Sequence, residues 1–292
     1  MAEKYSLLEH LLFPHTRLNN EKLRIRLKQK TVLITGASYG IGEALAYKLA
    51  ETDVYLILVA RTTSKLNSVK EEVIAKGGKA EVYTADLRNS EELEKLISFI
   101  KELEGGVDIF VNNAGKSIRR SIEDSLDRYH DFTRTMSLNY FAPVQLTLSL
   151  IPILKNNHGH IINISAVNVL LAPAPGWAAY QASKVAFDGW FRCIAPELNS
   201  RKVATTSVYL PLVKTRMIEP TVSYRNMPAM RPEHVARIIC KFILTRRRTF
   251  KPWWLFFGEM ASVIFRPLWE ISVTRHIEKE YHVSNDQKTV SY

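Results

Sequence analysis

The stretch 30-KTVLITGASYGIGEALAYKLA-50 is decisive for the fold. Residues 31–35 form a short apolar run typical of a buried strand, and residues 41–50 have the apolar spacing of a helix. The letters TGASYGIG between them place three glycines in one turn. Glycines let a backbone approach a pyrophosphate, and the first N–H groups of the helix then face its negative charge. Such turns also occur for purely structural reasons, so a nucleotide site needs support from the rest of the chain.

The same alternation of apolar runs and amphipathic stretches continues along the chain. Apolar strands separated by amphipathic helices indicate a parallel sheet covered on both faces, with right-handed crossovers. We therefore expect an α/β fold with a doubly wound parallel sheet of the Rossmann type, in which ligands bind at the carboxyl ends of the strands. The expected strands are 31–35, 54–60, 80–85, 107–111, 160–164 and 203–209, and the expected helices are 41–50, 64–76, 90–103, about 125–154 and 178–199.

The composition sets limits on size and organisation. With 292 residues, of which 46% are hydrophobic and 24% charged, the chain is long enough to bury one large core. No stretch is rich enough in Gly, Ser or Pro to be a linker, and no internal repeat is present. We expect a single main domain over 31–245, a helical N-terminal extension over 1–30, and a basic, aromatic-rich helical extension over 246–292.

Charge and cysteine content narrow the function classes. The formal net charge of +11 favours an anionic partner such as a phosphate-rich cofactor or an acidic lipid, although scattered lysines also occur on ordinary surfaces. Cys193 and Cys240 fit neither a disulfide framework nor a metal site, so we expect a reducing compartment and no metal. No run of about 18 uninterrupted apolar residues appears. The N-terminus lacks the cleavage site of a secretory signal, so a cytoplasmic protein is expected. Nucleic acid is not an expected partner.

The end of the second expected strand tests the nucleotide site. In dinucleotide-binding sheets an acidic residue at this place accepts hydrogen bonds from the adenosine 2′-hydroxyl. Here the strand ends in Ala60-Arg61. A carboxylate would repel a 2′-phosphate, whereas a guanidinium pairs with it, so the sequence predicts NADP(H) rather than NAD. The alternative is that Arg61 is only a solvated residue at a strand end.

Two further motifs, NNAG at 112–115 and YQASK at 180–184, follow the glycine-rich turn on the expected elements. With them the sequence resembles the short-chain dehydrogenase/reductase family over residues 30–245. The resemblance implies an adenine contact from the aspartate after the third strand, adenosine contacts from NNAG and nicotinamide contacts from the segment PLVKT. The expected cofactor site then comprises Gly36, Ser38, Tyr39, Gly40, Ile41, Gly42, Arg61, Asp86, Asn112, Ala114, Gly115, Tyr180, Lys184, Val213 and Thr215.

Tyr180 and Lys184 lie one turn apart on the same face of an expected helix. An unperturbed tyrosine has a pKa near 10, and we expect the Lys184 ammonium to lower the pKa of Tyr180 by favouring the phenolate. In a carbonyl reduction, Tyr180 would donate a proton to the carbonyl oxygen while NADPH delivers hydride. The resemblance adds Asn139, in SLNYF, as the residue that anchors a water beside Lys184. Taken by itself, Asn139 has the features of a helix-kink or capping residue.

The family also uses a serine to orient the substrate oxygen, and that serine is missing from its usual place. Counted forward from the strand the place is Ala166, and counted back from Tyr180 it is Val167. The loop is therefore longer than usual, and we expect a bulge at the strand end that re-aims Ser165 into this role. Two alternatives stay open: Asn168 or a backbone N–H acts instead, or the site is impaired at this step.

The segment LPLVKTRMIEPTVSYRNMPAMRPEH at 210–234 is expected to form a lid over the substrate. Its part PLVKTRMIEPT, together with HGHIINIS upstream, resembles the subgroup of the family that reduces long-chain acyl-CoA to aldehyde. Met217, Met227 and Met230 would give the lid an apolar, adaptable wall. The alternative is a lid that packs on its own core.

The C-terminal segment 252–273 combines Trp, Phe, Ile and Leu residues at helix-compatible spacing, and Arg and Lys residues precede it. This pattern is typical of an element that lies in a membrane interface without spanning the bilayer. A subunit interface or a cover for an acyl tunnel would account for the same residues.

These features predict an NADPH-dependent oxidoreductase that acts as a homo-oligomer on the carbonyl of a long apolar substrate. That substrate is either a fatty acyl-CoA or a lipid aldehyde or ketone. The alternative is a non-catalytic dinucleotide-binding or scaffold protein of the same fold, which the missing serine suggests. The intact Asn139, Tyr180 and Lys184 favour the enzyme, because losing one oxyanion donor slows catalysis about 100- to 1,000-fold without abolishing it.

Overall fold

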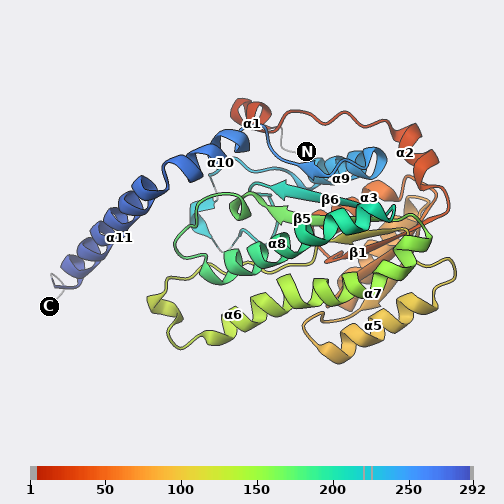
Figure 1. Cartoon of the computed structure of the whole chain (residues 1–292), viewed down its shortest axis with the longest axis horizontal. Helices are drawn as coiled ribbons and strands as arrows, with labels where there is room; N and C mark the ends of the chain where they lie inside the picture. The colour runs from red at the N-terminus through yellow and green to blue at the C-terminus, as the bar shows by residue number, and fades with distance from the viewer. Residues whose placement is uncertain (1–4, 220, 225, 290–292) are drawn as a thin grey trace.

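A seven-stranded parallel sheet forms the centre of the molecule, with the strand order β3-β2-β1-β4-β5-β6-β7 (Figure 1). The computed structural model describes residues 5–219, 221–224 and 226–289. Each strand pair is parallel, which confirms the expected doubly wound α/β sheet. The strands are β1 (Lys30–Thr35), β2 (Val54–Ala60), β3 (Lys79–Thr84), β4 (Ile109–Asn112), β5 (His160–Ala166), β6 (Ala204–Leu210) and β7 (Thr249–Phe250).

Helices cover both faces of the sheet. The core on one face includes side chains of α2, α3, α4 and α9, and the core on the other face includes side chains of α5, α7 and α8. The α-helices are α1 (Leu7–Leu12), α2 (Asn20–Leu27), α3 (Gly40–Leu49), α4 (Thr63–Ala75), α5 (Ser90–Glu102), α6 (Tyr129–Met136), α7 (Ala142–Asn156), α8 (Ala178–Ser200), α9 (Pro232–Thr245), α10 (Leu255–Ile264) and α11 (Arg266–Thr289).

The central strand β1 shows why the strands are apolar throughout. Val32 and Ile34 belong to the core on the α3 face, and Leu33 belongs to the core on the opposite face. All three side chains are fully buried. Because side chains alternate between the faces of a strand, a sheet covered on both sides needs a continuous apolar run. The glycine-rich turn follows β1 directly, at the carboxyl edge where such sheets bind ligands.

The long helix expected over 125–154 is interrupted. α6 is followed by a π-helical turn at Ser137–Phe141, and α7 begins after it. Pro143 has no N–H to donate to the carbonyl of Asn139 four residues earlier, which disfavours a regular helix here. The wider turn therefore falls on Asn139, and π-turns inside helices are frequent at functional sites.

By length and composition, the stretch Tyr129–Asn156 is the one helix among the described residues that could cross a membrane. In this fold the stretch packs on the sheet. Leu138, Leu146, Leu150 and Leu154 are all buried in the core on the α5 and α8 side. Burial in the core therefore accounts for part of its apolar composition.

Both extensions pack onto the body of the protein. Phe13 and the α2 residues Leu23 and Leu27 belong to the same core cluster as α3 and α9. After α9 the chain adds β7, which pairs with β6, so the sheet reaches Phe250 and extends past residue 245. α10 lies near α1 in Figure 1, and α11 extends away from the body.

Candidate active site

The glycine-rich turn lies between the carboxyl end of β1 and the start of α3. Gly36 (φ +67°) and Gly40 (φ +62°) adopt left-handed backbone conformations that favour glycine. A Cβ on Gly42 would lie 2.4 Å from the Gly36 carbonyl oxygen, so the turn closes too tightly for any side chain there. The start of α3 thus faces the carboxyl edge of the sheet, a place suited to an anion, and in the structure the Gly40 N–H donates to the Glu43 carboxylate at 3.2 Å. The other residues of the turn are partly exposed: Ser38, Tyr39 and Ile41.

Asn113, the second residue of the NNAG motif, locks this turn, a role that the sequence did not predict. Its side-chain amide donates hydrogen bonds to the carbonyls of Thr35 (2.9 Å) and Gly36 (3.1 Å). The Thr35 hydroxyl accepts hydrogen bonds from the backbone N–H groups of Asn113 and Ala114, both at 3.1 Å. The NNAG motif therefore holds the glycine-rich turn in place from the neighbouring strand end.

On the adenosine side, Arg61 follows β2 and Asp86 follows β3. The Arg61 side chain is 56% exposed, and its Nη1 lies 4.0 Å from Asp86 Oδ2. Arg88 contacts Asp86 more closely, because its Nε donates to both carboxylate oxygens at 3.0 and 3.1 Å. These hydrogen bonds hold the pKa of Asp86 below its usual value. Arg88 thus belongs to this edge of the site. The sequence analysis did not include it, because its contact with Asp86 depends on the turn that the chain makes after β3.

Two cations flank the ring of Tyr39 in the glycine-rich turn. Lys65 Nζ, from α4, lies 5.8 Å from the ring centroid, and Arg216 Cζ, from the lid segment, lies 5.2 Å from it. Both distances are within the range of cation–π contacts. With Arg61 at the end of the neighbouring β2, this part of the site has an excess of positive charge that suits a phosphate group.

The lid segment begins next to the glycine-rich turn. A Cβ on Gly40 would lie 2.9 Å from Thr215 Cγ2, so Thr215 packs directly against the turn. Val213 is buried and forms a β-bridge with Met230, which is only 1% exposed and lies in the core. The expected apolar wall is therefore wrong for Met230, because this part of the lid packs on its own core. The other two lid methionines are about half exposed: Met217 (47%) and Met227 (49%).

Lys184 projects from α8 towards the end of β5. Its Nζ donates a hydrogen bond to the carbonyl of Ile164 at 3.0 Å. A Cβ on Gly115 would lie 3.6 Å from the same Nζ, so the NNAG motif ends beside this amine. Burial lowers the pKa of Lys184 to about 8, while the Asp188 carboxylate one turn further along α8 raises it. Lys184 is therefore a partly exposed cation held between two strand ends.

Tyr180 does not have the lowered pKa expected from its neighbour Lys184. Burial and, to a smaller extent, Tyr224 of the lid raise the pKa of Tyr180 to about 12. Burial in a low-dielectric site disfavours the phenolate, and the Lys184 ammonium is directed at a carbonyl. Tyr180 therefore keeps its proton at neutral pH, which is the form that a proton donor needs.

Asn139 connects the segment after NNAG with α8, the helix that carries Tyr180 and Lys184. Its Nδ2 donates to the Lys116 carbonyl and to the Ser183 hydroxyl, both at 2.9 Å, and its Oδ1 accepts from the Lys116 N–H at 2.9 Å. The Ser183 hydroxyl in turn donates to the carbonyl of Tyr180 at 2.7 Å. Asn139 thus ties the segment after NNAG to the first turn of α8 and lies with Tyr180 and Lys184.

The expected bulge at the end of β5 is absent. Pairing with β6 is regular through Ser165↔Tyr209 and Ala166↔Leu210. The extra residue is accommodated after the strand, where Val167–Val169 form a 3₁₀ turn. The expectation was wrong because the parallel ladder continues to the last residue of the strand, so the added length is absorbed where no ladder has to be kept.

Ser165 and Asn168 nevertheless remain distinctive. In the part of the chain that the structure describes, Ser165 Oγ and Asn168 Oδ1 are buried without a hydrogen-bond partner. Ser165 shares a strand face with Ile161 and Asn163, and Ile161 packs in the same core as α8. Asn163 also accepts a hydrogen bond from Asn112 at 3.3 Å, which joins the ends of β4 and β5. Both Ser165 and Asn168 thus have polar atoms that a ligand could satisfy.

Comparisons with known proteins point to one family. A sequence model described as short chain dehydrogenase matches residues 30–226. A fatty acyl-CoA reductase of Acinetobacter baylyi is 41% identical over 251 residues, which is 84% of each chain. A fatty acyl-CoA reductase of Mycobacterium tuberculosis is 37% identical over 238 residues, or 81% of this chain and 80% of its own. A metagenomic short-chain oxidoreductase solved with NADP matches with a TM-score of 0.65 and 28% identity, over 75% of this chain and 92% of its own.

The matched region runs from β1 into the lid segment and contains the glycine-rich turn, NNAG and YQASK. In the structure these three motifs lie at neighbouring strand ends and contact one another through Asn113, Gly115 and Lys184. The order of the motifs, their contacts and the parallel sheet agree with the sequence matches. The chain belongs to the short-chain dehydrogenase/reductase family of oxidoreductases.

Proposed function

We propose that the protein is an NADPH-dependent reductase of a long apolar carbonyl compound, with fatty acyl-CoA as the main candidate and a lipid aldehyde or ketone as the second. The observation that carries this proposal is the hydrogen-bonded network of Asn139, Tyr180 and Lys184 beside the NNAG motif, in which Asn139 is buried and the other two residues are partly exposed. The names of two relatives as fatty acyl-CoA reductases support the substrate class.

The residues present fit NADP(H). The glycine-rich turn would hold the pyrophosphate at the start of α3, and Arg61, Lys65 and Arg216 around Tyr39 would attract the 2′-phosphate. Bound there, the nicotinamide supplies the hydride. The NADP in the related metagenomic structure supports this assignment.

The side chains of this protein then have separate roles. Tyr180, protonated at neutral pH, donates its proton to the substrate oxygen as negative charge develops there. The Lys184 ammonium stabilises the phenolate that remains, and Asn139 holds the loop and helix that position both groups. We assign to Ser165 the second hydrogen bond to the substrate oxygen, because its buried hydroxyl has no partner among the described residues.

The surroundings of Tyr180 suit an apolar substrate. Trp177 contacts the Tyr180 ring edge-on at 5.8 Å and stacks on Tyr224 of the lid at 6.0 Å, with 4° between the ring planes. Leu171 lies in the loop between β5 and α8, and a Cβ on Gly258 of α10 would lie 3.0 Å from the Leu171 Cδ2. Aromatic groups from the start of α8 and from the lid thus lie beside the proton donor, as suits an apolar acyl chain.

A surface of exposed apolar side chains, called here the apolar platform, lies next to this loop. Trp253 Nε1 donates to the Leu11 carbonyl at 3.0 Å, which joins α1 to the start of α10. The Ala172 N–H donates to Ser262 Oγ of α10 at 3.0 Å, which joins α10 to the loop. The platform consists of Leu7, Leu8, Leu11, Trp253, Phe256, Phe257, Met260, Val263, Ile264 and Leu268, each at least 46% exposed.

We propose that the apolar platform, and with it the segment 252–273, lies on an anionic membrane surface. α10 has 10 residues, so it is about 15 Å long and covers only half of a bilayer core of about 30 Å. It can therefore lie in the interface but cannot span it. The contact between α10 and the loop at Ala172 would place the catalytic centre next to a source of lipid substrate. The alternative is that the apolar platform covers an acyl tunnel. Measuring whether the protein binds lipid vesicles distinguishes the two.

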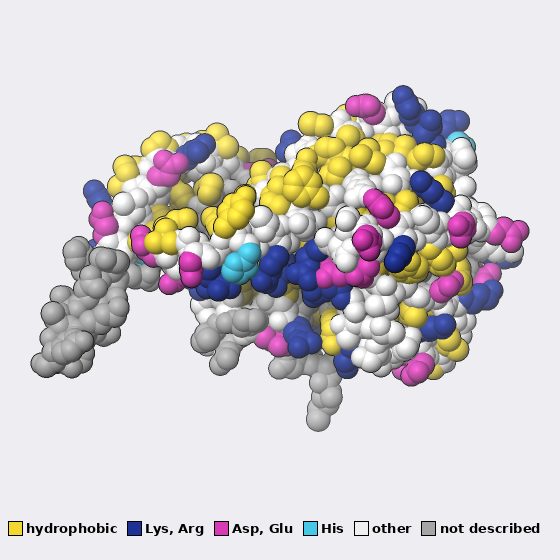
Figure 2. Space-filling model, turned by 90° about the horizontal axis from the view of Figure 1, so that it is seen from below, with side chains coloured by type: hydrophobic (Ala, Val, Ile, Leu, Met, Phe, Trp, Pro, Cys, Tyr) yellow, Lys and Arg dark blue, Asp and Glu magenta, His cyan; other side chains and the backbone are white. Residues whose placement is uncertain are grey.

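A cytoplasmic homo-oligomer is proposed as well. Phe141 and Leu148 lie seven residues apart, on one side of the π-turn and α7, and are 59% and 54% exposed. Figure 2 shows a band of hydrophobic side chains across the face seen from below in Figure 1. Light scattering of the purified protein measures the oligomeric state, and a monomer at micromolar concentration would contradict the proposal.

NADPH consumption with a panel of fatty acyl-CoAs, aldehydes and ketones tests the proposed activity. We expect turnover with long-chain substrates and a loss of at least about 100-fold in Tyr180→Phe, which removes the proton donor and leaves NADPH binding intact. Fluorescence titration with NADPH provides the control. NADPH binding without consumption of any substrate would instead support the non-catalytic dinucleotide-binding protein.

A further inference from the structure

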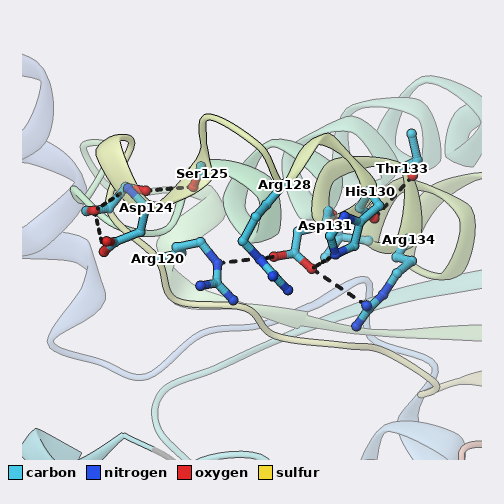
Figure 3. Close-up of polar contacts among 10 residues, drawn as sticks. Arg120, Asp124, Ser125, Arg128, His130, Asp131, Thr133 and Arg134 are labelled. Carbon is cyan, nitrogen blue, oxygen red and sulfur yellow. Dashed lines mark hydrogen bonds and ion pairs between the residues drawn. The ribbon is translucent and has the colours of Figure 1, made fainter.

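A cluster of basic side chains surrounds the buried carboxylate of Asp131 at the start of α6 (Figure 3). Arg120 Nε and Arg128 Nε lie 3.1 and 3.2 Å from Asp131 Oδ2. Arg134 Nη1 and His130 Nε2 lie 3.7 and 3.6 Å from Oδ1. Three guanidinium groups therefore share one carboxylate, and we call Arg120, Arg128 and Arg134 the arginine cluster.

The charges within the arginine cluster do not balance. One carboxylate neutralises one of the three guanidinium charges, and charges of like sign this close repel one another. Arg120 and Arg128 use their Nε atoms on Asp131, and no acceptor for their terminal NH₂ groups is present among the residues that the structure describes. Their side chains are only 33% and 36% exposed. Arg134 Nε is buried without a hydrogen-bond partner among the described residues. Guanidinium groups with N–H donors that no protein acceptor uses are suited to an anion.

Nearby carboxylates do not supply the missing negative charge. Glu123, Asp124 and Asp127 lie between Arg120 and Arg128 in the chain, and all three residues are exposed. Asp124 is engaged within its own turn, where it accepts a hydrogen bond from the Ser121 hydroxyl at 2.6 Å. Figure 3 shows this carboxylate apart from the guanidinium groups.

The arginine cluster lies at the rim of the candidate catalytic centre. The Arg120 N–H donates to the carbonyl of Gly176 at 2.7 Å, just before the helix that carries Tyr180. At the other end of the same segment, both backbone groups of Lys116 are bonded to Asn139. The segment 116–120 therefore runs from Asn139 to the loop before Tyr180, and an anion at the cluster would lie beside the substrate entrance.

Further cations extend the cluster. Burial lowers the pKa of Lys116, and the charges of Arg134, Arg88 and Arg61 lower it further, so these groups are close enough to affect one another. Figure 2 shows Lys and Arg side chains gathered on the face seen from below, the side on which α6 runs in Figure 1. Arg88 and Arg61, which belong to the adenosine side of the cofactor site, are there paired with Asp86.

We propose that the arginine cluster binds the phosphate groups of the nucleotide part of an acyl-CoA substrate, while the thioester reaches Tyr180. The inference rests on the proposed function and deepens it by assigning a binding site to the CoA part of the substrate. Guanidinium groups bind phosphate oxygens in pairs, and the flexible arm between phosphates and thioester allows the two ends to occupy separate subsites. An aldehyde or ketone has no group for this cluster, so the assignment separates the two candidate substrate classes.

Steady-state kinetics of Arg128→Gln and Arg134→Gln test the proposal. We expect the KM for a long-chain acyl-CoA to rise about 10-fold in each variant, because one charge-assisted contact is lost. The KM for NADPH and for a long-chain aldehyde should change by less than about twofold, since neither relies on the cluster. Lys101→Gln on α5 is the matched control, because Lys101 is an exposed lysine outside the cluster and the change removes one positive charge.

A third variant covers the case in which loss of a partner of buried Asp131 prevents folding. Arg119 is exposed and forms no ion pair with Asp131 among the described residues, but it lies beside Gly176. Arg119→Gln should therefore fold normally and raise the KM for acyl-CoA by a few fold, about threefold. Unfolding curves of all variants show which of them can be compared.

The outcomes separate this proposal from the proposed function. Unchanged KM for acyl-CoA in folded variants would overturn the arginine cluster as a phosphate site and leave the reductase intact. An equal rise in the KM for NADPH would assign the cluster to the cofactor and overturn the proposal as well. If the wild type reduces only aldehydes, calorimetric titration with free CoA decides. Binding that weakens in Arg128→Gln supports the site, and absence of binding to the wild type overturns it.

Discussion

Lys184 is the residue whose charge state should control the pH dependence of activity. Its pKa is about 8, lowered by burial and raised by Asp188. Since the ammonium form stabilises the phenolate of Tyr180, activity should fall as pH rises through about 8. Asp188→Asn removes the negative charge that raises this pKa, so the alkaline limb of the pH–rate profile should move to lower pH. An unmoved limb in a folded variant would show that Asp188 has no effect on Lys184.

The residue that orients the substrate oxygen can be identified by three substitutions at the end of β5. Ser165→Ala should lower kcat about 100-fold with little change in NADPH affinity, because its hydroxyl has no other partner among the described residues. If Asn168 has the role instead, Asn168→Ala is the damaging change and Ser165→Ala is nearly silent. Faster turnover in Ala166→Ser would show that the usual family position still faces the substrate.

Arg61 should determine the choice between the two nicotinamide cofactors. Arg61→Ser removes an exposed guanidinium at the end of β2 and leaves the buried Ala60 in place. We expect the KM for NADPH to rise about 10-fold and the KM for NADH to stay unchanged, because only NADPH carries the 2′-phosphate. Steady-state kinetics with both cofactors measure the ratio of the two KM values. A wild type that already prefers NADH would contradict the assignment.

At the scale of elements, α1 fastens the lid to the N-terminal extension. The Glu9 carboxylate accepts hydrogen bonds from the N–H groups of Ser6 (2.9 Å) and Ala229 (3.4 Å) and lies 3.3 Å from Lys214 Nζ. Burial alone would raise the pKa of Glu9, but these hydrogen bonds and Lys214 lower it overall. The stabilisation is therefore present above the unfolded pKa of Glu9 and is lost as pH falls through the folded one.

Glu9→Gln should lower the free energy of unfolding by about 1–2 kcal/mol at neutral pH, because it weakens these contacts. The difference from the wild type should shrink towards zero at an acidic pH below the folded pKa of Glu9, where the wild-type carboxyl is also uncharged. Urea unfolding at both pH values measures this. Glu21→Gln, on the exposed side of α2, is the control. Equal stability of wild type and Glu9→Gln at neutral pH would show that α1 does not fasten the lid.

The π-turn between α6 and α7 is the clearest case of an element that the periodicity of the sequence did not predict. Its residues 137–141 continue the apolar pattern of a helix, so one uninterrupted helix was expected. Pro143 removes a helical donor, and the amide of Asn139 bonds to Lys116 and Ser183 from other segments. The turn is thus stabilised by contacts across the fold, which local spacing does not contain.

For the whole molecule, the apolar platform predicts binding to a lipid surface. Leu8→Glu combined with Val263→Glu places a charge on each of its two helices, α1 and α10. We expect co-sedimentation with vesicles containing phosphatidylserine to fall at least about 10-fold, since each buried apolar side chain contributes about 1.5 kcal/mol or more. Ile74→Glu, an exposed position on α4, is the control. Equal sedimentation of the wild type and the Leu8→Glu, Val263→Glu double variant would contradict a membrane role for this surface.

The sequence alone determined the sheet, the glycine-rich turn and the pairing of Tyr180 with Lys184. Each depends on local rules, because strands and helices follow apolar periodicity, and two residues one turn apart share a helix face. Only the tertiary structure decided that Asn113 locks the turn, that β5 has no bulge and that burial raises the pKa of Tyr180. The same holds for the contacts of Arg120 with Gly176 and of Trp253 with Leu11. These features depend on burial and on contacts between segments far apart in the chain, and both are set by how the elements pack rather than by the spacing of residues within them.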